Sequence, residues 1–113
     1  MVKSSAATLD LVFAALSDST RRTVLESLSA GSLAVTELSQ PHAMSLPGFM
    51  KHLRVLEEAG LVERSKEGRV VHCTLAAEPM REAASWLSRY QKFWTERLDA
   101  LDRYLKQQKR SKQ

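Results

Sequence analysis

Five basic side chains in two neighbouring segments are the residues of this chain best suited to chemistry. Lys51 and Arg54 lie three positions apart, so a helix would place them on one face. Arg64, Lys66 and Arg69 follow in a segment with strand-forming residues on either side. Such side chains donate hydrogen bonds to phosphate oxygens and to guanine O6 and N7. The pattern therefore indicates binding to a nucleic acid.

A capped helix carries the first two of these residues. Ser45 is a good N-cap, Pro47 suits the first turn because its missing N–H needs no partner there, and Gly60 ends the helix. The small residues at its start, Pro47 and Gly48, would let the helix approach a groove closely.

The hydrophobic period of this helix decides which way its basic residues face. Phe49, Leu53 and Leu56 recur at i, i+4 and i+7, so they must face a core. Lys51 and Arg54 then lie on the opposite side, where we expect them to enter the major groove of DNA.

Two flanking residues of the helix have smaller expected roles. Met50 is placed to touch a thymine methyl group, so base recognition relies on apolar contact and DNA shape as well as on hydrogen bonds. His52 borders the buried face, and this favours contact with a phosphate or with the third predicted helix, residues 33–40, over contact with a base. The candidate DNA-binding residues are Ser45, Pro47, Gly48, Met50, Lys51, His52, Arg54, Arg64, Lys66 and Arg69.

A two-stranded hairpin is predicted directly after the helix. Residues 61–66 and 70–75 form the strands, and Glu67 with Gly68 suits the positive φ of a tight turn. The three remaining basic residues line this hairpin. Arg69 is the expected contact with a phosphate or the minor groove, and a solvated loop charge is the alternative.

Three shorter helices are predicted before the capped helix. Thr8 can begin the first, Asp18 can cap the second, and residues 33–40 hold enough apolar side chains for the third. Arg21 and Arg22 lie near the start of the second helix. Each could contact a phosphate or serve only as a solvated or internally paired charge.

The longest predicted helix runs from Pro79 to about Lys106. At 1.5 Å per residue it would be about 40 Å long, more than a domain of this size needs. Its apolar stripe must be buried, either on its own core or, more simply, against a second copy of the chain through a two-fold interface of the first and last helices. The candidate interface residues are Leu9, Val12, Phe13, Leu87, Tyr90, Trp94, Leu98, Leu101 and Leu105.

Length and composition fit one small intracellular domain. The chain has 113 residues, 17 lysines and arginines against 13 acidic residues, and a single cysteine, Cys73, which excludes an internal disulfide. We expect an N-terminal arm over residues 1–7, a winged-helix domain over residues 8–106 and a basic tail over residues 107–113. No segment has the pattern of a signal peptide or a membrane span, so a cytoplasmic protein is expected.

The order of these segments resembles the ArsR/SmtB family of homodimeric winged-helix repressors. The resemblance covers about residues 9–105 and rests on FAALSDSTRRTVLESL, LAVTEL, SLPGFMKHLRVLEEAGLV and the EGR tip of the hairpin. It implies five helices, a two-stranded wing, a dimer built by the first and last helices, and operator binding by the helix that starts at Ser45.

The chain departs from that family at its metal sites. The best-known members carry a Cys-x-Cys pair after a leucine, where this chain has Ala34 and Thr36 following Leu33. The other family site needs Asp and His on the last helix, and no histidine follows His72. Neither set supplies the right ligands, so metal sensing through these sites is not expected, and no cofactor is expected. The segments QPHAMSLPGFMKHL and WLSRYQKFWTERLDALDRYL resemble instead a non-metal-sensing subgroup of the family.

Together these features predict a mainly α (α+β) fold, a winged helix-turn-helix with five helices and a two-stranded wing. No nucleophile-and-base motif, phosphate loop or paired carboxylate site is present, so an enzyme is not expected. The predicted function is that of a homodimeric regulator, a repressor of its own operon, which binds double-stranded DNA at an inverted repeat with half-sites about one helical turn apart. A small-molecule effector of unknown identity stays open. The alternative is a winged-helix module that binds other proteins and does not read DNA.

Overall fold

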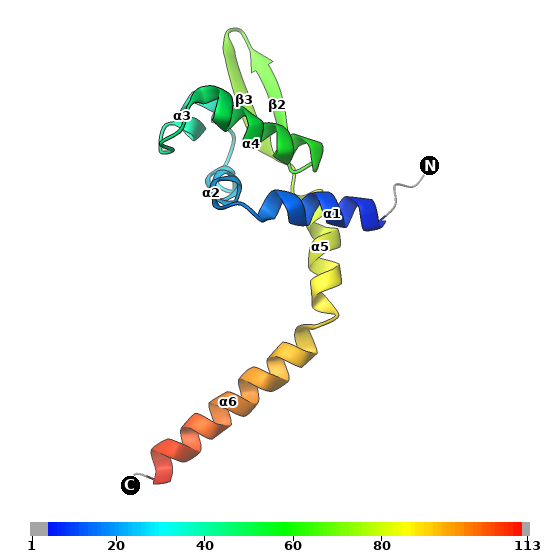
Figure 1. Cartoon of the computed structure of the whole chain (residues 1–113), viewed down its shortest axis with the longest axis vertical. Coiled ribbons are helices and arrows are strands. Elements are labelled where there is room, and N and C mark those ends of the chain that lie inside the picture. Colours follow the sequence, from blue (N-terminus) through cyan, green and yellow to red (C-terminus); the bar gives the residue numbers. More distant parts are fainter. Residues whose placement is uncertain (1–4, 112–113) are drawn as a thin grey trace. The chain divides into compact units, whose positions relative to one another are not determined.

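The computed structural model describes residues 5–111, and these form six helices and three strands (Figure 1). The chain divides into two compact units, one that ends at Ala83 and one that begins at Ala84. The elements are, in order, α1 (Ser5–Leu16), α2 (Ser19–Leu28), β1 (Leu33–Ala34), α3 (Val35–Ser39), α4 (Leu46–Glu58), β2 (Val62–Glu67), β3 (Val70–Leu75), α5 (Glu78–Ser88) and α6 (Gln91–Ser111).

The core of the first unit lies where α1, α2 and α4 pack against the sheet. Phe49, Leu53 and Leu56 of α4 are all 0% exposed, so the inward face predicted from their spacing is confirmed. Val12 of α1 and Val24 of α2 are buried in the same cluster. Burial of a Leu or Phe side chain contributes about 1.5–3 kcal/mol, which makes this contact the main restraint on α4.

The predicted ends of α4 are also confirmed. The Ser45 hydroxyl accepts a hydrogen bond from the Gly48 N–H at 3.2 Å, the N-cap geometry expected of a serine. Gly60 follows the helix with a φ of +75°, a conformation that favours glycine.

Three antiparallel strands form the sheet, in the order β1, β3, β2. The third strand, β1, was not predicted, because residues 33–40 read as one helix. Leu33 and Ala34 instead pair with Cys73 and His72 of β3, and the Glu37 carboxylate accepts the Ala34 N–H at 3.0 Å where α3 begins.

The hairpin between β2 and β3 is confirmed, but its turn lies one residue later than predicted. Glu67 pairs with Val70, so Gly68 and Arg69 are the two central residues of the turn. Gly68 has a φ of +63°, the geometry that places glycine first in a tight hairpin turn. Arg69 therefore lies at the very tip of the wing.

The single long helix expected from Pro79 is wrong, because α5 and α6 are separate helices. The Arg89 and Tyr90 N–H groups bond to Trp86 and Leu87 carbonyls, an i to i−3 pattern that tightens the last turn of α5. The Ser88 hydroxyl donates to the Ser85 carbonyl at 2.6 Å, a local bond that competes with helix continuation.

Both ends of the described chain are more helical than expected. The first helix begins at Ser5 instead of Thr8, within the predicted arm. The last helix continues to Ser111, so residues 107–111 of the predicted tail are helical. The rest of both predicted segments, residues 1–4 and 112–113, lies outside the described residues. Among residues 5–111 none of the helices has the length and apolar character that crossing a membrane requires.

Candidate nucleic-acid interface

The outward face of α4 carries the predicted basic pair. Lys51 and Arg54 are exposed, as are Ser45 and Pro47 at the start of the helix. Gly48 is half-buried, and a Cβ there would lie 3.2 Å from the Ser45 hydroxyl oxygen. Glycine at this position therefore leaves room for the Ser45 hydroxyl, which accepts the hydrogen bond that caps the helix.

Apolar residues of α4 differ in how far they face solvent. Met50 is half-buried and packs against the core, which limits its reach toward a base. Leu46, in the first turn, is instead 56% exposed, and the preceding Met44 is also exposed.

The three basic residues of the wing differ in their freedom. Arg64 Nε lies 2.8 Å from Glu57 Oε1, so this arginine ties β2 to the end of α4. Lys66 and Arg69 are exposed, with Arg69 at the hairpin tip. Lys66 and Arg69 therefore stay the candidates for contact between the wing and DNA, whereas Arg64 has a structural partner.

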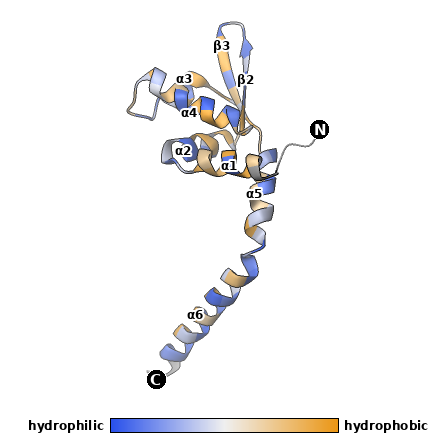
Figure 2. Ribbon diagram, turned by 45° about the vertical axis from the view of Figure 1, so that its right-hand side comes forward, coloured by the Kyte–Doolittle hydropathy of each residue, from blue (hydrophilic) through white to orange (hydrophobic). Residues whose placement is uncertain are grey.

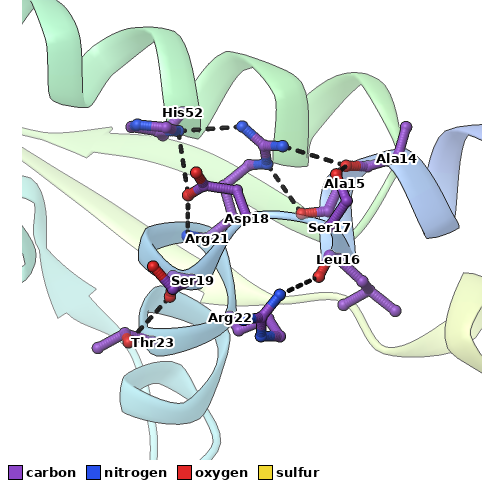
Figure 3. A network of polar contacts seen from close by, with 10 residues as sticks. All are labelled: Ala14, Ala15, Leu16, Ser17, Asp18, Ser19, Arg21, Arg22, Thr23 and His52. Atoms are coloured by element: carbon purple, nitrogen blue, oxygen red, sulfur yellow. Dashed lines mark hydrogen bonds and ion pairs between the residues drawn. The ribbon is translucent and has the colours of Figure 1, made fainter.

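His52 lies in a polar cluster that the sequence did not reveal (Figure 3). Its Nδ1 atom is 3.0 Å from Arg21 Nη1 and 3.6 Å from Asp18 Oδ2. Asp18 also caps α2, since its carboxylate accepts the Arg21 N–H at 3.1 Å. The helix that His52 contacts is therefore α2, and not the predicted third helix over residues 33–40; its contact with a phosphate stays a prediction.

Arg21 and Arg22 both turn back to the end of α1. Arg21 Nε donates to the Ala15 carbonyl at 2.8 Å, and Arg22 Nη1 donates to the Leu16 carbonyl at 2.7 Å. The last carbonyls of a helix lack partners within it, and cations there also interact favourably with the helix dipole. Of the two roles left open by the sequence, the structure therefore shows the internal one.

The Asp18 carboxyl should make the folded state less stable at low pH than at neutral pH. The hydrogen bond from the Arg21 N–H holds the pKa of Asp18 below its ordinary value, and partial burial opposes this effect. A lowered folded-state pKa means that the ionised form stabilises the protein above the unfolded value, about 3.9, and that this contribution is lost as the pH falls through the folded value. We expect Asp18→Asn to unfold at lower urea than the parent at pH 7, with the difference shrinking at pH 3.

Asp10→Asn is the control for this prediction, because Asp10 is exposed on α1 and caps no helix. Its urea midpoint should follow that of the parent at both pH values. A constant difference between Asp18→Asn and the parent across this range would contradict the role given to the charge.

Neither Cys73 nor the histidines form a reactive or metal-binding group in the described part of the chain. Cys73 is fully buried on β3, and burial raises the pKa of its thiol, which disfavours the reactive thiolate. His42 stacks on Phe49 with ring centroids 5.5 Å apart. Among residues 5–111 no three His, Cys, Asp or Glu side chains lie close enough to hold a metal ion.

The candidate dimer residues of α1 have a different character from those of α5 and α6. Val12 is 0% exposed within its own core, so its assignment to an interface is wrong. Leu9 and Phe13 are half-buried and pack on the same core, whereas the neighbouring Leu11, which was not predicted, is 47% exposed.

In the second unit, hydrophobic residues recur along α6 (Figure 2). Trp94 is 60% exposed and Leu98 is 64% exposed, and Leu101 and Leu105 continue the stripe at helical spacing. The α5 and turn candidates, Leu87 and Tyr90, are also exposed. The side chains of this stripe therefore form an exposed apolar surface on the second unit.

A short helix, a turn, a capped helix with an outward basic face, and a hairpin with basic residues define a winged helix-turn-helix. This confirms the predicted fold class, with a third strand and a divided last helix as the differences. A helix-turn-helix domain family matches residues 16–65. The chain belongs to the ArsR family of winged helix-turn-helix transcriptional regulators, since it is 41% identical to a solved member of that family and covers 97% of it.

Three relatives show the extent of this similarity. The transcriptional repressor SdpR of Bacillus subtilis (strain 168) is 26% identical over 76 residues, which cover 67% of this chain and 84% of SdpR. The crystal structure of the ArsR family transcriptional regulator RHA00566 has a TM-score of 0.74 at 41% identity, covering 84% of this chain and 97% of that one. The solution structure of the homodimeric winged helix-turn-helix domain of Mb0332 from Mycobacterium bovis has a TM-score of 0.58 at 26% identity, covering 82% and 91%.

Proposed function

We propose that the protein is a homodimeric repressor that binds an inverted-repeat operator and blocks transcription from its own promoter. The α4 helix enters the major groove, and the wing contacts the flanking backbone or minor groove. Each subunit reads one half-site, so the half-sites lie about one helical turn apart.

The observation that carries this proposal is the basic face of α4. Lys51 and Arg54 are both exposed on the side opposite the buried Phe49 and Leu53. Among the described residues neither Lys51 nor Arg54 forms an ion pair, whereas Arg64 on the wing does. Exposed basic side chains on a rigidly packed helix are suited to guanine and phosphate contacts.

Two relatives support the finer parts of the proposal. SdpR is named a transcriptional repressor, and the Mb0332 domain is described as homodimeric. The exposed stripe of α6, together with Leu11 on α1, supplies apolar surface that a second copy would bury.

We further propose that this regulator does not respond to metal through the family sites. Ala34 is a buried β1 residue and Thr36 is in α3, so the usual thiolate pair is replaced by side chains that cannot coordinate a soft metal. Selection of genomic fragments that the purified protein binds identifies the operator. The same selection with zinc added tests for a metal response, and with cell extract added it tests for another effector. Release of the fragments by zinc alone would contradict the metal argument.

Truncation of either basic residue on α4 should weaken operator binding. We expect Lys51→Ala and Arg54→Ala each to cost about 1–3 kcal/mol of binding free energy, because each removes a charged donor from the groove face. The fold should be unaffected, since both side chains are exposed. Fluorescence anisotropy with the selected fragment measures the affinities, and circular dichroism checks the fold.

Lys92→Ala is the matched control, because Lys92 is an exposed lysine whose ion pair, with Glu96, lies within α6. Parent affinity should also fall steeply with salt, with a log–log slope of about 0.9 per neutralised phosphate. If Lys51→Ala and Arg54→Ala bind as tightly as Lys92→Ala, the groove face is misassigned. A chain that binds no fragment at any salt concentration would instead favour a protein-binding module.

A further inference from the structure

The Arg21 side chain joins three elements of the first unit through one guanidinium group (Figure 3). Its Nε donates to the Ala15 carbonyl at 2.8 Å and its Nη2 donates to the Ala14 carbonyl at 3.1 Å, both at the end of α1. Its Nη1 lies 3.0 Å from His52 Nδ1 on α4. One residue of α2 therefore links α1 to the helix that carries the DNA-binding face.

The contact with Arg21 fixes where the His52 proton lies. An arginine guanidinium has only N–H groups, so His52 Nδ1 must be the acceptor in the 3.0 Å contact. The other neighbour of Nδ1, Asp18 Oδ2, is 3.6 Å away, which is too long for a hydrogen bond. In this contact Nδ1 carries no proton, so the ring N–H group is the one at Nε2.

The Nε2 side of the ring is turned away from this cluster. In Figure 3 the end of the His52 ring opposite Nδ1 points away from both Asp18 and Arg21. The side chain is 24% exposed, and His52 follows Lys51 directly in α4. An N–H group at the edge of a DNA-binding face is placed to donate to a backbone phosphate.

We propose that Arg21 is a positioning residue for operator binding. It holds α4 against the end of α1 and engages His52 Nδ1 as an acceptor, so that the Nε2–H of the same ring donates to a phosphate of the operator backbone. This inference rests on the proposed function, because it concerns how the same helix meets DNA.

Arg22 provides a matched control for the experiment. It has the same charge and also caps α1, through the Leu16 carbonyl at 2.7 Å, but this contact does not involve α4. We expect Arg21→Gln to weaken binding to the selected operator about tenfold relative to Arg22→Gln, the effect of one lost hydrogen bond to a charged group. Both variants lose a helix cap, so a purely structural role would lower both unfolding temperatures without separating their affinities.

Two further measurements test the route through His52. Long-range ¹H–¹⁵N spectra should show the Nε2–H tautomer of His52 in the parent and in Arg22→Gln, and a mixture of tautomers in Arg21→Gln. His52→Ala should weaken binding about tenfold, the effect of one lost hydrogen bond to a charged group. In that background Arg21→Gln should have little further effect, since both changes remove one coupled interaction.

Three outcomes would overturn the inference. These are equal affinities of Arg21→Gln and Arg22→Gln, an Nδ1–H tautomer in the parent, or additive effects of Arg21→Gln and His52→Ala. Each of them leaves operator binding by the parent intact, whereas a parent that binds no DNA refutes the proposed function itself.

Discussion

Leu98→Asp should convert the proposed dimer to a monomer and abolish operator binding at concentrations where the parent is saturated. Leu98 is 64% exposed in the single chain and lies between Trp94 and Leu101 on the α6 stripe. Two-fold symmetry places one new carboxylate from each subunit in the dimer interface. Burial of an unpaired charge costs about 3–5 kcal/mol, more than a dimer of this size is expected to tolerate.

The variant should still fold, because the buried core cluster consists of residues of the first unit. Sedimentation velocity measures the oligomeric state, and circular dichroism checks the helix content. Ala100→Asp is the control, since it adds the same charge to an exposed position off the stripe. If Leu98→Asp sediments like the parent and like Ala100→Asp, the dimer interface lies elsewhere on the chain.

The parts of the fold that the sequence predicted well are determined by neighbouring residues. The N-cap at Ser45 and the stop at Gly60 are local events, and the inward face of α4 follows from a helical period. The hairpin was predicted for the same reason, although the turn was placed one residue too early. Glycine favours positive φ at either central position of such a turn, so composition alone did not fix the register.

One of the missed features depends on residues that are far apart in the chain. Strand β1 exists because Leu33 and Ala34 bond to β3, about forty residues later, and a window of local sequence favours a helix there. The break between α5 and α6 has no proline or glycine to signal it. A continuous apolar stripe through this region read as one helix.

The candidate site was predicted in part for similar reasons. The exposure of Lys51 and Arg54 followed from helix geometry, and their contact with DNA stays a prediction. The roles of Arg21 and Arg64 could not be read from sequence, since their partners lie on other elements at positions set by the tertiary fold. The interface residues predicted on α1 failed for another reason. Val12 and Leu11 are adjacent in sequence, yet only Leu11 faces solvent.

Leu53→Ala should destabilise the protein by about 2–5 kcal/mol, because it removes a fully buried side chain and leaves a cavity behind α4. Leu46→Ala makes the same chemical change on the same helix, at a position that is 56% exposed, and should alter stability by less than about 0.5 kcal/mol. Urea unfolding followed by circular dichroism measures both. Since small domains are stable by only about 5–15 kcal/mol, Leu53→Ala should also lower the amount of folded regulator.

The pair also separates stability from recognition on one helix. Loss of Leu53 should reduce operator binding only in proportion to the fraction of unfolded chain, whereas any loss of affinity in Leu46→Ala must come from the exposed surface of the first turn. Similar stability of the two variants would mean that the inward face of α4 contributes less to the core than its burial implies, and α4 would then lack the rigid support that groove binding needs.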